Sequence, residues 1–178
     1  MLYFSLKGKV ALITGATNGI GSGMAKGLVD ADIDQLILTY RSDNSFEAVK
    51  KEFKEINSAV KVDGIKVDLS AEDEDATVNT IAEQAIKLAQ DGKIHILINN
   101  AGINNRHPFE DFPADQFAAV LKIYLNIPIH LTKKIGTHML HTKTEVPHVF
   151  TALLLSFHGG ILATAYAYIV TAPFWVTL

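Results

Sequence analysis

Short apolar runs alternate with stretches of helical periodicity along most of the chain. The run at 9–14 is followed by a glycine-rich turn, which is typical of a buried strand. Apolar residues at 46, 49, 53 and 56 recur at spacings of three and four and predict one buried helix face. The complete pattern predicts strands at 9–14, 35–40, 65–68, 95–99 and 149–155, and helices at 21–30, 46–56, 71–89 and 113–140.

This alternation of strands and helices indicates one α/β domain. Strands joined by helices of this length form right-handed βαβ units, which build a parallel sheet with helices on both faces. The 178 residues contain no internal repeat and no low-complexity linker, and their number suits a single domain over 1–178. We therefore expect a doubly wound parallel sheet.

The composition supports a buried core and excludes several classes of function. Of the residues, 48% are hydrophobic and 20% are charged, and the net charge is -3. Without a basic field, the chain is not expected to bind nucleic acid or an anionic membrane. It has no cysteine, so disulfides, thiolate nucleophiles and cysteine-based metal sites are excluded. The histidines do not form a pair with a third ligand, and no metal is expected.

The turn after the first predicted strand has the features of a phosphate site. It has the sequence TGATNGIG over 14–21, with glycines at 15, 19 and 21 that let the backbone turn sharply. The helix that follows would direct its free N–H groups and the positive end of its dipole at the same place. A dinucleotide pyrophosphate requires a strand before such a turn and a helix after it. We therefore expect nucleotide binding here.

The end of the second predicted strand indicates which nicotinamide cofactor is favoured. NAD sites carry an acid there to bind the ribose hydroxyls, whereas this chain has Tyr40, Arg41 and Ser42. A guanidinium can pair with the 2′-phosphate of NADP(H). NADP(H) is favoured, and NAD(H) stays open because Arg41 could be a solvated loop residue and Asp43 is near.

Two motifs about eighty residues apart resemble signatures of the short-chain dehydrogenase/reductase family. The first is TGxxxGIG at 14–21, and the second is NNAG at 99–102, where the fourth predicted strand ends. The run LLSFHGG at 154–160 is similar to the branch of the family that acts on sugar acids and sugar alcohols. The resemblance covers about residues 5–166 and implies a Rossmann-type fold whose last strands would be missing from this chain.

By this resemblance, the cofactor residues of the family can be carried over to this chain. Asp68, at the end of the third predicted strand, matches the acid that contacts adenine. The expected cofactor-binding residues are Gly15, Thr17, Asn18, Gly19, Ile20, Gly21, Tyr40, Arg41, Asp68, Leu69, Asn100, Ala101 and Gly102. The resemblance also implies a small-molecule substrate and a homo-oligomer, although the helix after Tyr166 that carries much of the subunit contact would be largely absent.

The catalytic residues that the resemblance implies are only partly present. Moving a hydride at a carbonyl carbon also requires moving a proton at its oxygen. The family uses a Tyr, a Lys four residues later, a Ser thirteen residues earlier and an Asn on the preceding helix. Tyr166 and Asn126 match the Tyr and the Asn, but Val170 and Leu153 stand where the Lys and the Ser are expected.

These positions leave two hypotheses open. The first is an NADP(H)-dependent oxidoreductase that transfers a hydride between nicotinamide and a carbonyl or secondary alcohol of a sugar-derived compound. The second is a catalytically inactive, truncated relative that at most binds the dinucleotide. Without the Lys cation, a Tyr with a pKa of about 10 stays protonated at neutral pH, so whether the chain is an enzyme is left open.

The end of the chain is uncharged, apart from histidines, after Glu145. The stretch at 161–178 is just long enough for a membrane span, but Pro173 and the lack of a basic flank argue against one. A second interpretation is a hairpin that covers the sheet edge. The interpretation we favour is a divergent tail at 167–178 left by truncation or a reading-frame change. The start of the chain lacks a signal-peptide pattern, and we expect a cytoplasmic protein.

Overall fold

A parallel sheet forms the centre of the computed structural model, which describes residues 5–103, 107–144 and 148–150. Within these ranges the strand order is β3-β2-β1-β4-β5. The strands are β1 (Val10–Thr14), β2 (Gln35–Tyr40), β3 (Lys61–Lys66), β4 (Ile96–Asn99) and β5 (His148–Phe150). The helices are α1 (Gly19–Asp30), α2 (Asp43–Ile56), α3 (Glu74–Leu88), α4 (Ala114–Leu121) and α5 (Ile127–His141), with short turns η1 (Gln90–Gly92) and η2 (Phe109–Asp111) and a π-helical segment η3 (Lys122–Asn126).

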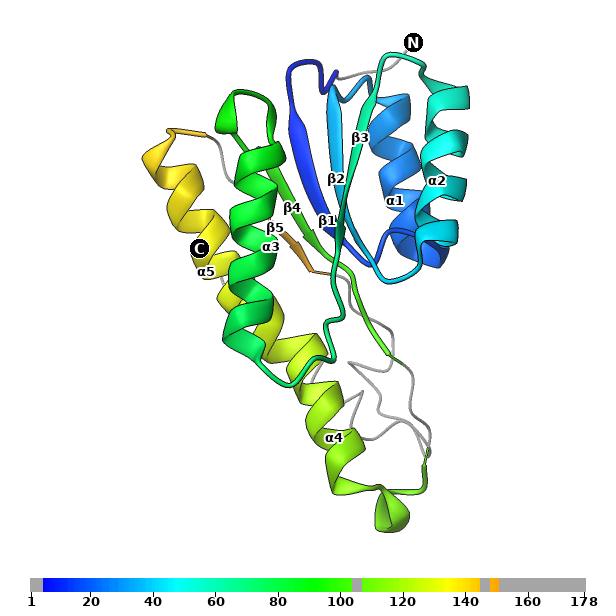
Figure 1. The fold of residues 1–178 in the computed structure, drawn as a ribbon, viewed down its shortest axis with the longest axis vertical. Coiled ribbons are helices and arrows are strands. Elements are labelled where there is room, and N and C mark those ends of the chain that lie inside the picture. The colour runs from blue at the N-terminus through cyan, green and yellow to red at the C-terminus, as the bar shows by residue number, and fades with distance from the viewer. Residues whose placement is uncertain (1–4, 104–106, 145–147, 151–178) are drawn as a thin grey trace.

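Helices cover both faces of the sheet, as the alternating pattern predicts. Figure 1 shows α1 and α2 together on one face and α3 and α5 on the other, while α4 extends beyond the end of the sheet. Successive strands along the chain are joined through helices and all paired strands are parallel, so the doubly wound α/β fold is confirmed.

Two apolar clusters, one on each face of the sheet, stabilise this arrangement. Val10 and Leu12 of β1 belong to the cluster under α3 and α5, whereas Ala11 and Ile13 belong to the cluster under α1 and α2. Successive residues of a strand point to opposite faces, and both faces are covered here. The strand is therefore apolar at four successive positions, Val10 to Ile13, rather than at every second one, which explains the continuous run in the sequence.

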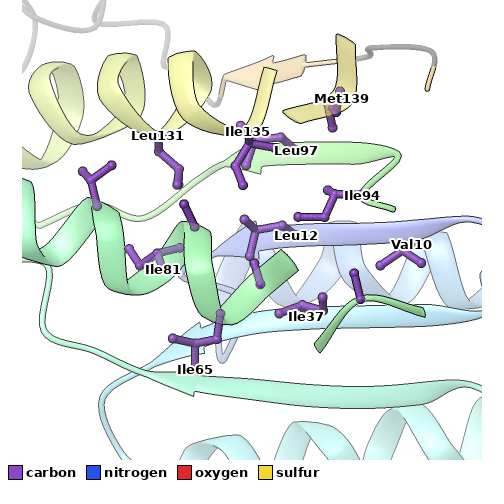
Figure 2. Close-up of a cluster of buried hydrophobic side chains, with 14 of the residues drawn as sticks. Val10, Leu12, Ile37, Ile65, Ile81, Ile94, Leu97, Leu131, Ile135 and Met139 are labelled. Carbon is purple, nitrogen blue, oxygen red and sulfur yellow. The ribbon is translucent and has the colours of Figure 1, made fainter. Parts of the chain in front are cut away.

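Side chains from both helices meet the strands in the cluster under α3 and α5 (Figure 2). Ile81 of α3 and Leu131 and Ile135 of α5 are fully buried there, together with Leu12 and Leu97 from neighbouring strands. Burial of each such side chain stabilises the fold by roughly 1.5–3 kcal/mol. This packing holds the parallel strands together, so that their carboxyl ends lie at the same end of the sheet.

The third strand lies earlier in the chain than its apolar residues suggest. The prediction of a strand at 65–68 was wrong, because β3 spans Lys61–Lys66 and pairs with β2 from Gln35 to Tyr40. β3 is an edge strand of the described sheet, and only two of its residues are buried. Gly64 leaves room for the stacked rings of Tyr40 and Phe46, because a Cβ atom there would lie 2.6 Å from each ring. A strand of this composition has no apolar run to detect.

The helix predicted at 113–140 is present but interrupted. η3 separates α4 from α5, and the Ile127 N–H donates to the carbonyl of Lys122, five residues earlier. Pro128 follows and has no N–H to continue an α-helical ladder. The proline accounts for the interruption, since kinks and π-turns have such local causes.

The remaining predictions concern the end of the chain. β5 pairs with β4 over His148–Phe150, which agrees with the first part of the strand predicted at 149–155. Residues 151–178, including the uncharged tail, lie outside the described residues. Among the helices that the structure describes, none combines the length and the apolar character needed to cross a membrane.

Candidate cofactor site

A cavity of about 390 Å³ lies at the carboxyl ends of β1, β2 and β4. The chain passes from β1 outward to β2 and β3, then returns to β4 on the other side of β1. Doubly wound sheets bind ligands beyond the carboxyl ends of the strands at this point of reversal. The cavity therefore occupies the position that the topology favours.

The structure brings the predicted cofactor residues together around this cavity. All of them except Gly19 contribute to its lining, which includes Gly15, Thr17, Asn18, Ile20, Gly21, Tyr40, Arg41, Asp68, Leu69, Asn100, Ala101 and Gly102. Gly19 is the first residue of α1 and has a φ of 54°, a conformation that L side chains rarely adopt. Four segments that are distant in the sequence, one after each of β1, β2, β3 and β4, thus form one site.

Close contact between the two sequence motifs explains two of the glycines. Gly15 has a φ of 67°, and a Cβ atom there would lie 2.7 Å from the Cα of Ala101. At Gly21, a Cβ atom would meet the carbonyl of Gly15 and the side chain of Asn100. Backbone conformation and packing therefore both require glycine in this turn.

Hydrogen bonds join the same two motifs. The hydroxyl oxygen of Thr14, a buried side chain, accepts from the N–H groups of Asn100 and Ala101, each at 3.1 Å. In return, Nδ2 of Asn100 donates to the carbonyls of Thr14 and Gly15 at 3.3 and 2.9 Å. The glycine turn and the NNAG turn are therefore one rigid unit, although about 85 residues separate them.

The N-terminus of α1 presents backbone N–H groups at this unit. Asn18 precedes the helix in an extended conformation, and its side chain makes no capping hydrogen bond. The first turn carries no acidic side chain. The orphan N–H groups and the positive end of the helix dipole suit a phosphate. The residues present thus fit a dinucleotide pyrophosphate.

Charges at the end of β2 distinguish Arg41 from Asp43. Arg41 lines the cavity, whereas the carboxylate of Asp43 forms an ion pair with Lys66 of β3. The hydrogen bond from Lys66 holds the pKa of Asp43 below its usual value. Since the cation that faces the cavity is Arg41 and the nearby carboxylate is already paired, the arrangement fits an anionic group better than ribose hydroxyls.

Asp68 lines the cavity from the loop that follows β3. The sequence prediction that it ends the third strand was wrong, because β3 ends at Lys66. Its Oδ1 accepts from the hydroxyl and the N–H of Ser70 at 2.7 and 2.9 Å. These bonds, and more weakly the charge of Arg41, lower the pKa of Asp68. The carboxylate is therefore fixed and ionised at neutral pH.

Only Asn126 of the predicted catalytic pair lies within the described residues. Asn126 is the last residue of η3, and its Nδ2 donates to Oε2 of Glu74 at 3.3 Å. It does not line the cavity. Tyr166 lies outside the described residues, as do Leu153 and Val170. The catalytic assignments stay predictions.

Several residues that line the cavity were not predicted from the sequence. The hydroxyl of Thr39 accepts from the N–H of Gly15 at 3.3 Å and so ties the glycine turn to β2. Its position next to Tyr40, at the carboxyl end of β2, is a signal that could have identified it. Ile123 and Tyr124 reach the cavity from η3, and no pattern in the sequence indicates a π-helical turn there.

Comparisons with known proteins agree with this geometry. The family model described as short chain dehydrogenase matches residues 9–167. A 2-dehydro-3-deoxy-D-gluconate 5-dehydrogenase of Bacillus subtilis is 39% identical over 92% of this chain and 60% of its own length. An L-rhamnose 1-dehydrogenase (NADP(+)) of Thermoplasma acidophilum is 33% identical over 90% of this chain and 60% of its own length.

A solved structure has the same fold and a bound cofactor. It is a Beutenbergia cavernae protein, assigned as an NAD(P)-dependent gluconate 5-dehydrogenase, that contains NADP at low occupancy. It is 30% identical, with a TM-score of 0.82 over 96% of this chain and 64% of its own. The chain spans about 60% of the length of the two curated relatives named above. Because the family model matches most of the residues of this chain, the chain belongs to the short-chain dehydrogenase family.

Proposed function

We propose that this chain is part of an NADP(H)-dependent oxidoreductase that transfers a hydride between nicotinamide and a carbonyl or secondary alcohol of a sugar-derived compound. The observation that carries the proposal is the cavity at the carboxyl ends of β1, β2 and β4, with the N-terminus of α1 and Arg41 on its walls. A bound nicotinamide would supply or accept the hydride. The described residues would bind and orient the cofactor.

The division of charge around the cavity supports NADP(H) over NAD(H). The N–H groups at the start of α1 would hold the pyrophosphate, and Arg41 would pair with the 2′-phosphate. Asp43, which would be the acid for a free ribose, pairs with Lys66 and does not line the cavity. NADP in the Beutenbergia cavernae structure and the name of the Thermoplasma acidophilum relative support the same choice.

The substrate class rests on the relatives rather than on the cavity. Those named above act on 2-dehydro-3-deoxy-D-gluconate, on L-rhamnose and on gluconate, according to their names. A sugar-derived small molecule is therefore the substrate that we propose. A cytoplasmic location and the absence of a nucleic-acid partner, both expected from the sequence, belong to the same proposal.

The second candidate function is dinucleotide binding without turnover. Val170 and Leu153 stand where the resemblance expects the Lys and the Ser of the catalytic set. Loss of a positioned acid–base group lowers rates roughly 10²–10⁴-fold. This sequence observation favours a chain that binds NADP(H) and turns over slowly or not at all.

Fluorescence titration with NADPH and NADH tests the cofactor assignment. We expect Arg41→Ala to weaken NADPH binding by about 1–3 kcal/mol, because a charge-assisted hydrogen bond is lost, and to leave NADH binding nearly unchanged. Lys51→Ala is the matched control, since it removes an exposed cation of α2 that does not line the cavity. Equal NADPH affinity in the Arg41 variant and the control would remove the assignment.

Turnover separates the two candidate functions. NADPH consumption with a panel of keto sugar acids and keto sugars would support the oxidoreductase. Binding of NADPH with no consumption for any of them would support the non-catalytic candidate.

A further inference from the structure

We propose that Lys122 and Tyr124 are positioning residues that hold the two loops on which the NADP(H) site depends, and we call this pair the η3 clamp. The proposal rests on the proposed function, because it assigns the clamp to the same cavity. One loop follows β3 and contributes Asp68 and Leu69 to the cavity. The other follows β4 and contributes Asn100, Ala101 and Gly102.

Tyr124 fixes the loop that follows β4. Its hydroxyl donates to the carbonyl of Ile103 at 2.6 Å. Its ring lies against Gly102, where a Cβ atom would be 2.7 Å from Cζ of the ring. Both Ile103 and Tyr124 line the cavity. The tyrosine therefore supports this loop at its far end, while Thr14 holds the near end through Asn100 and Ala101.

Lys122 fixes the loop that follows β3. Its ammonium donates to the carbonyls of Ala71 and Glu72, the second at 3.1 Å. These carbonyls come directly after the Asp68–Ser70 turn, in which Oδ1 of Asp68 accepts from Ser70. The bonds from Lys122 connect this loop to a helix more than 50 residues away in the sequence. The lysine thus restrains the segment that carries Asp68.

A single helical segment can serve both loops because of its geometry. Side chains two positions apart on a helix point in different directions, so Lys122 and Tyr124 reach separate loops from the same turn of backbone. Single π-turns occur frequently at functional sites. Here Ile127 closes the π-turn by donating to the carbonyl of Lys122, which anchors the clamp at its base.

Restraint of these loops should strengthen cofactor binding. In both loops, the residues that line the cavity belong to neither a helix nor a strand. Ordering such segments upon binding costs conformational entropy. If the η3 clamp already orders these loops in the free protein, binding of the cofactor loses less conformational entropy. Removing the hydrogen bonds of either Lys122 or Tyr124 should therefore weaken NADPH binding, while the free energy of global unfolding changes little.

The test combines NADPH titration with amide hydrogen exchange of the free 178-residue chain. Tyr124→Phe removes the hydroxyl and keeps the ring against Gly102, and we expect two- to tenfold faster exchange at Asn100 and Ala101, roughly the value of one hydrogen bond. Lys122→Met should have the same effect at Ser70 and Ala71. Each variant should also weaken NADPH binding by about two- to tenfold, and Lys122→Arg should restore most of the affinity.

Two control variants remove equivalent hydrogen bonds elsewhere. Thr137→Val removes a hydroxyl that donates to the carbonyl of Lys133 at 2.7 Å on the exposed side of α5. Lys54→Met removes an ammonium that donates to the carbonyl of Ser58 at 3.2 Å. Neither should change exchange in the two loops or the affinity for NADPH.

The outcomes distinguish this inference from the proposed function. Exchange in the loops of the clamp variants equal to that in the controls would show that no clamp exists. Faster exchange with unchanged NADPH affinity would also overturn the inference, because the loops would then be restrained for another reason. Failure of the unsubstituted chain to bind NADPH would contradict both the proposed function and the assignment of the clamp to NADP(H), while exchange would still decide whether the two residues hold the loops.

Discussion

The two ends of the sheet differ in how their polar groups are used. Each end has a hollow, of about 390 Å³ at the carboxyl ends of the strands and about 580 Å³ at the amino ends. The one at the amino ends is lined by residues that precede β2 and β3, among them Asp34, Asn57 and Lys61. Volume alone does not single out the carboxyl end as the ligand site.

Polar groups at the amino end bind one another. Lys61 forms an ion pair with Asp63 at 3.1 Å, and Asp34 accepts from the N–H of Gly8 at 2.9 Å. The fully buried Gln35 donates to Asp63 and to the carbonyl of Leu88 and accepts from the N–H of Gln90. These contacts stabilise the fold and leave few donors for a ligand.

At the carboxyl end, the side chain of Asn18 makes no capping bond to α1, and Arg41 faces the cavity. The hydrogen bonds present there, such as those of Thr14 and Asn100, hold the turns in place without capping the helix. The comparison teaches that a site is marked by donors that the fold leaves available, and that the size of a hollow is a poor guide.

The largest expected difference comes from two glycines with similar backbone conformations. Gly15 and Gly8 have φ angles of 67° and 77°, but only at Gly15 would a Cβ atom meet other atoms. Gly15→Ala should destabilise the protein by about 2–5 kcal/mol through strain and overpacking and abolish NADPH binding. Gly8→Ala should cost about 1–2 kcal/mol for backbone conformation alone and leave binding intact. Denaturant unfolding measures the stability of both variants, and NADPH titration measures their affinity. Equal losses of stability and affinity in the two variants would contradict the proposed difference between the two ends of the sheet.

A smaller effect is expected at the amino end from Gln35→Leu. The N–H of Gln90, the carbonyl of Leu88 and the carboxylate of Asp63 would each lose their hydrogen bond with the side chain of Gln35. This loss should lower the free energy of unfolding by about 1–3 kcal/mol. Affinity of the remaining folded protein for NADPH should not change. Gln84→Leu, on the exposed side of α3, is the control and should stay within about 0.5 kcal/mol of the unsubstituted protein. A loss of NADPH affinity in Gln35→Leu would show that the two ends are coupled.

The smallest effect concerns pH and His95 at the amino end of β4. Burial, and then the charges of Lys9 and Lys93, lower the pKa of His95, and Nδ1 of its neutral ring accepts from the N–H of Val10 at 3.2 Å. Because the folded pKa is depressed, the contribution to stability is complete above the unfolded pKa of about 6.5 and is lost as the pH falls below it. Thermal melts of His95→Phe should show a smaller drop between about pH 7.5 and pH 5 than the unsubstituted protein. An unchanged drop would mean that His95 titrates alike in the folded and unfolded chains.

Much of the fold and of the cofactor site could be predicted from the sequence. The strand at 35–40 was placed correctly because both its faces are buried, which gives it an uninterrupted apolar run at Leu36, Ile37 and Leu38. The glycines and the NNAG motif could be identified because the backbone contact between Gly15 and Ala101 permits few residue types. Where local chemistry dictates the residue, the sequence carries the information.

The features that were missed depend on contacts between distant segments. β3 has a polar edge composition and takes its register from β2. Pairing of Asp43 with Lys66 joins two elements 23 residues apart, and the bonds of Lys122 and Tyr124 depend on a π-turn. None of these produces a periodic pattern. The catalytic role of Tyr166 stays a prediction.

The most direct test of the account is to map by amide exchange where NADPH binds on the unsubstituted chain. We predict protection at Gly19, Ile20 and Gly21 at the start of α1 and near Arg41, with NADPH bound more tightly than NADH. Protection around Asn57 and Lys61 at the opposite end of the sheet, or no binding of either dinucleotide, would contradict the claim that the carboxyl-end cavity is the cofactor site.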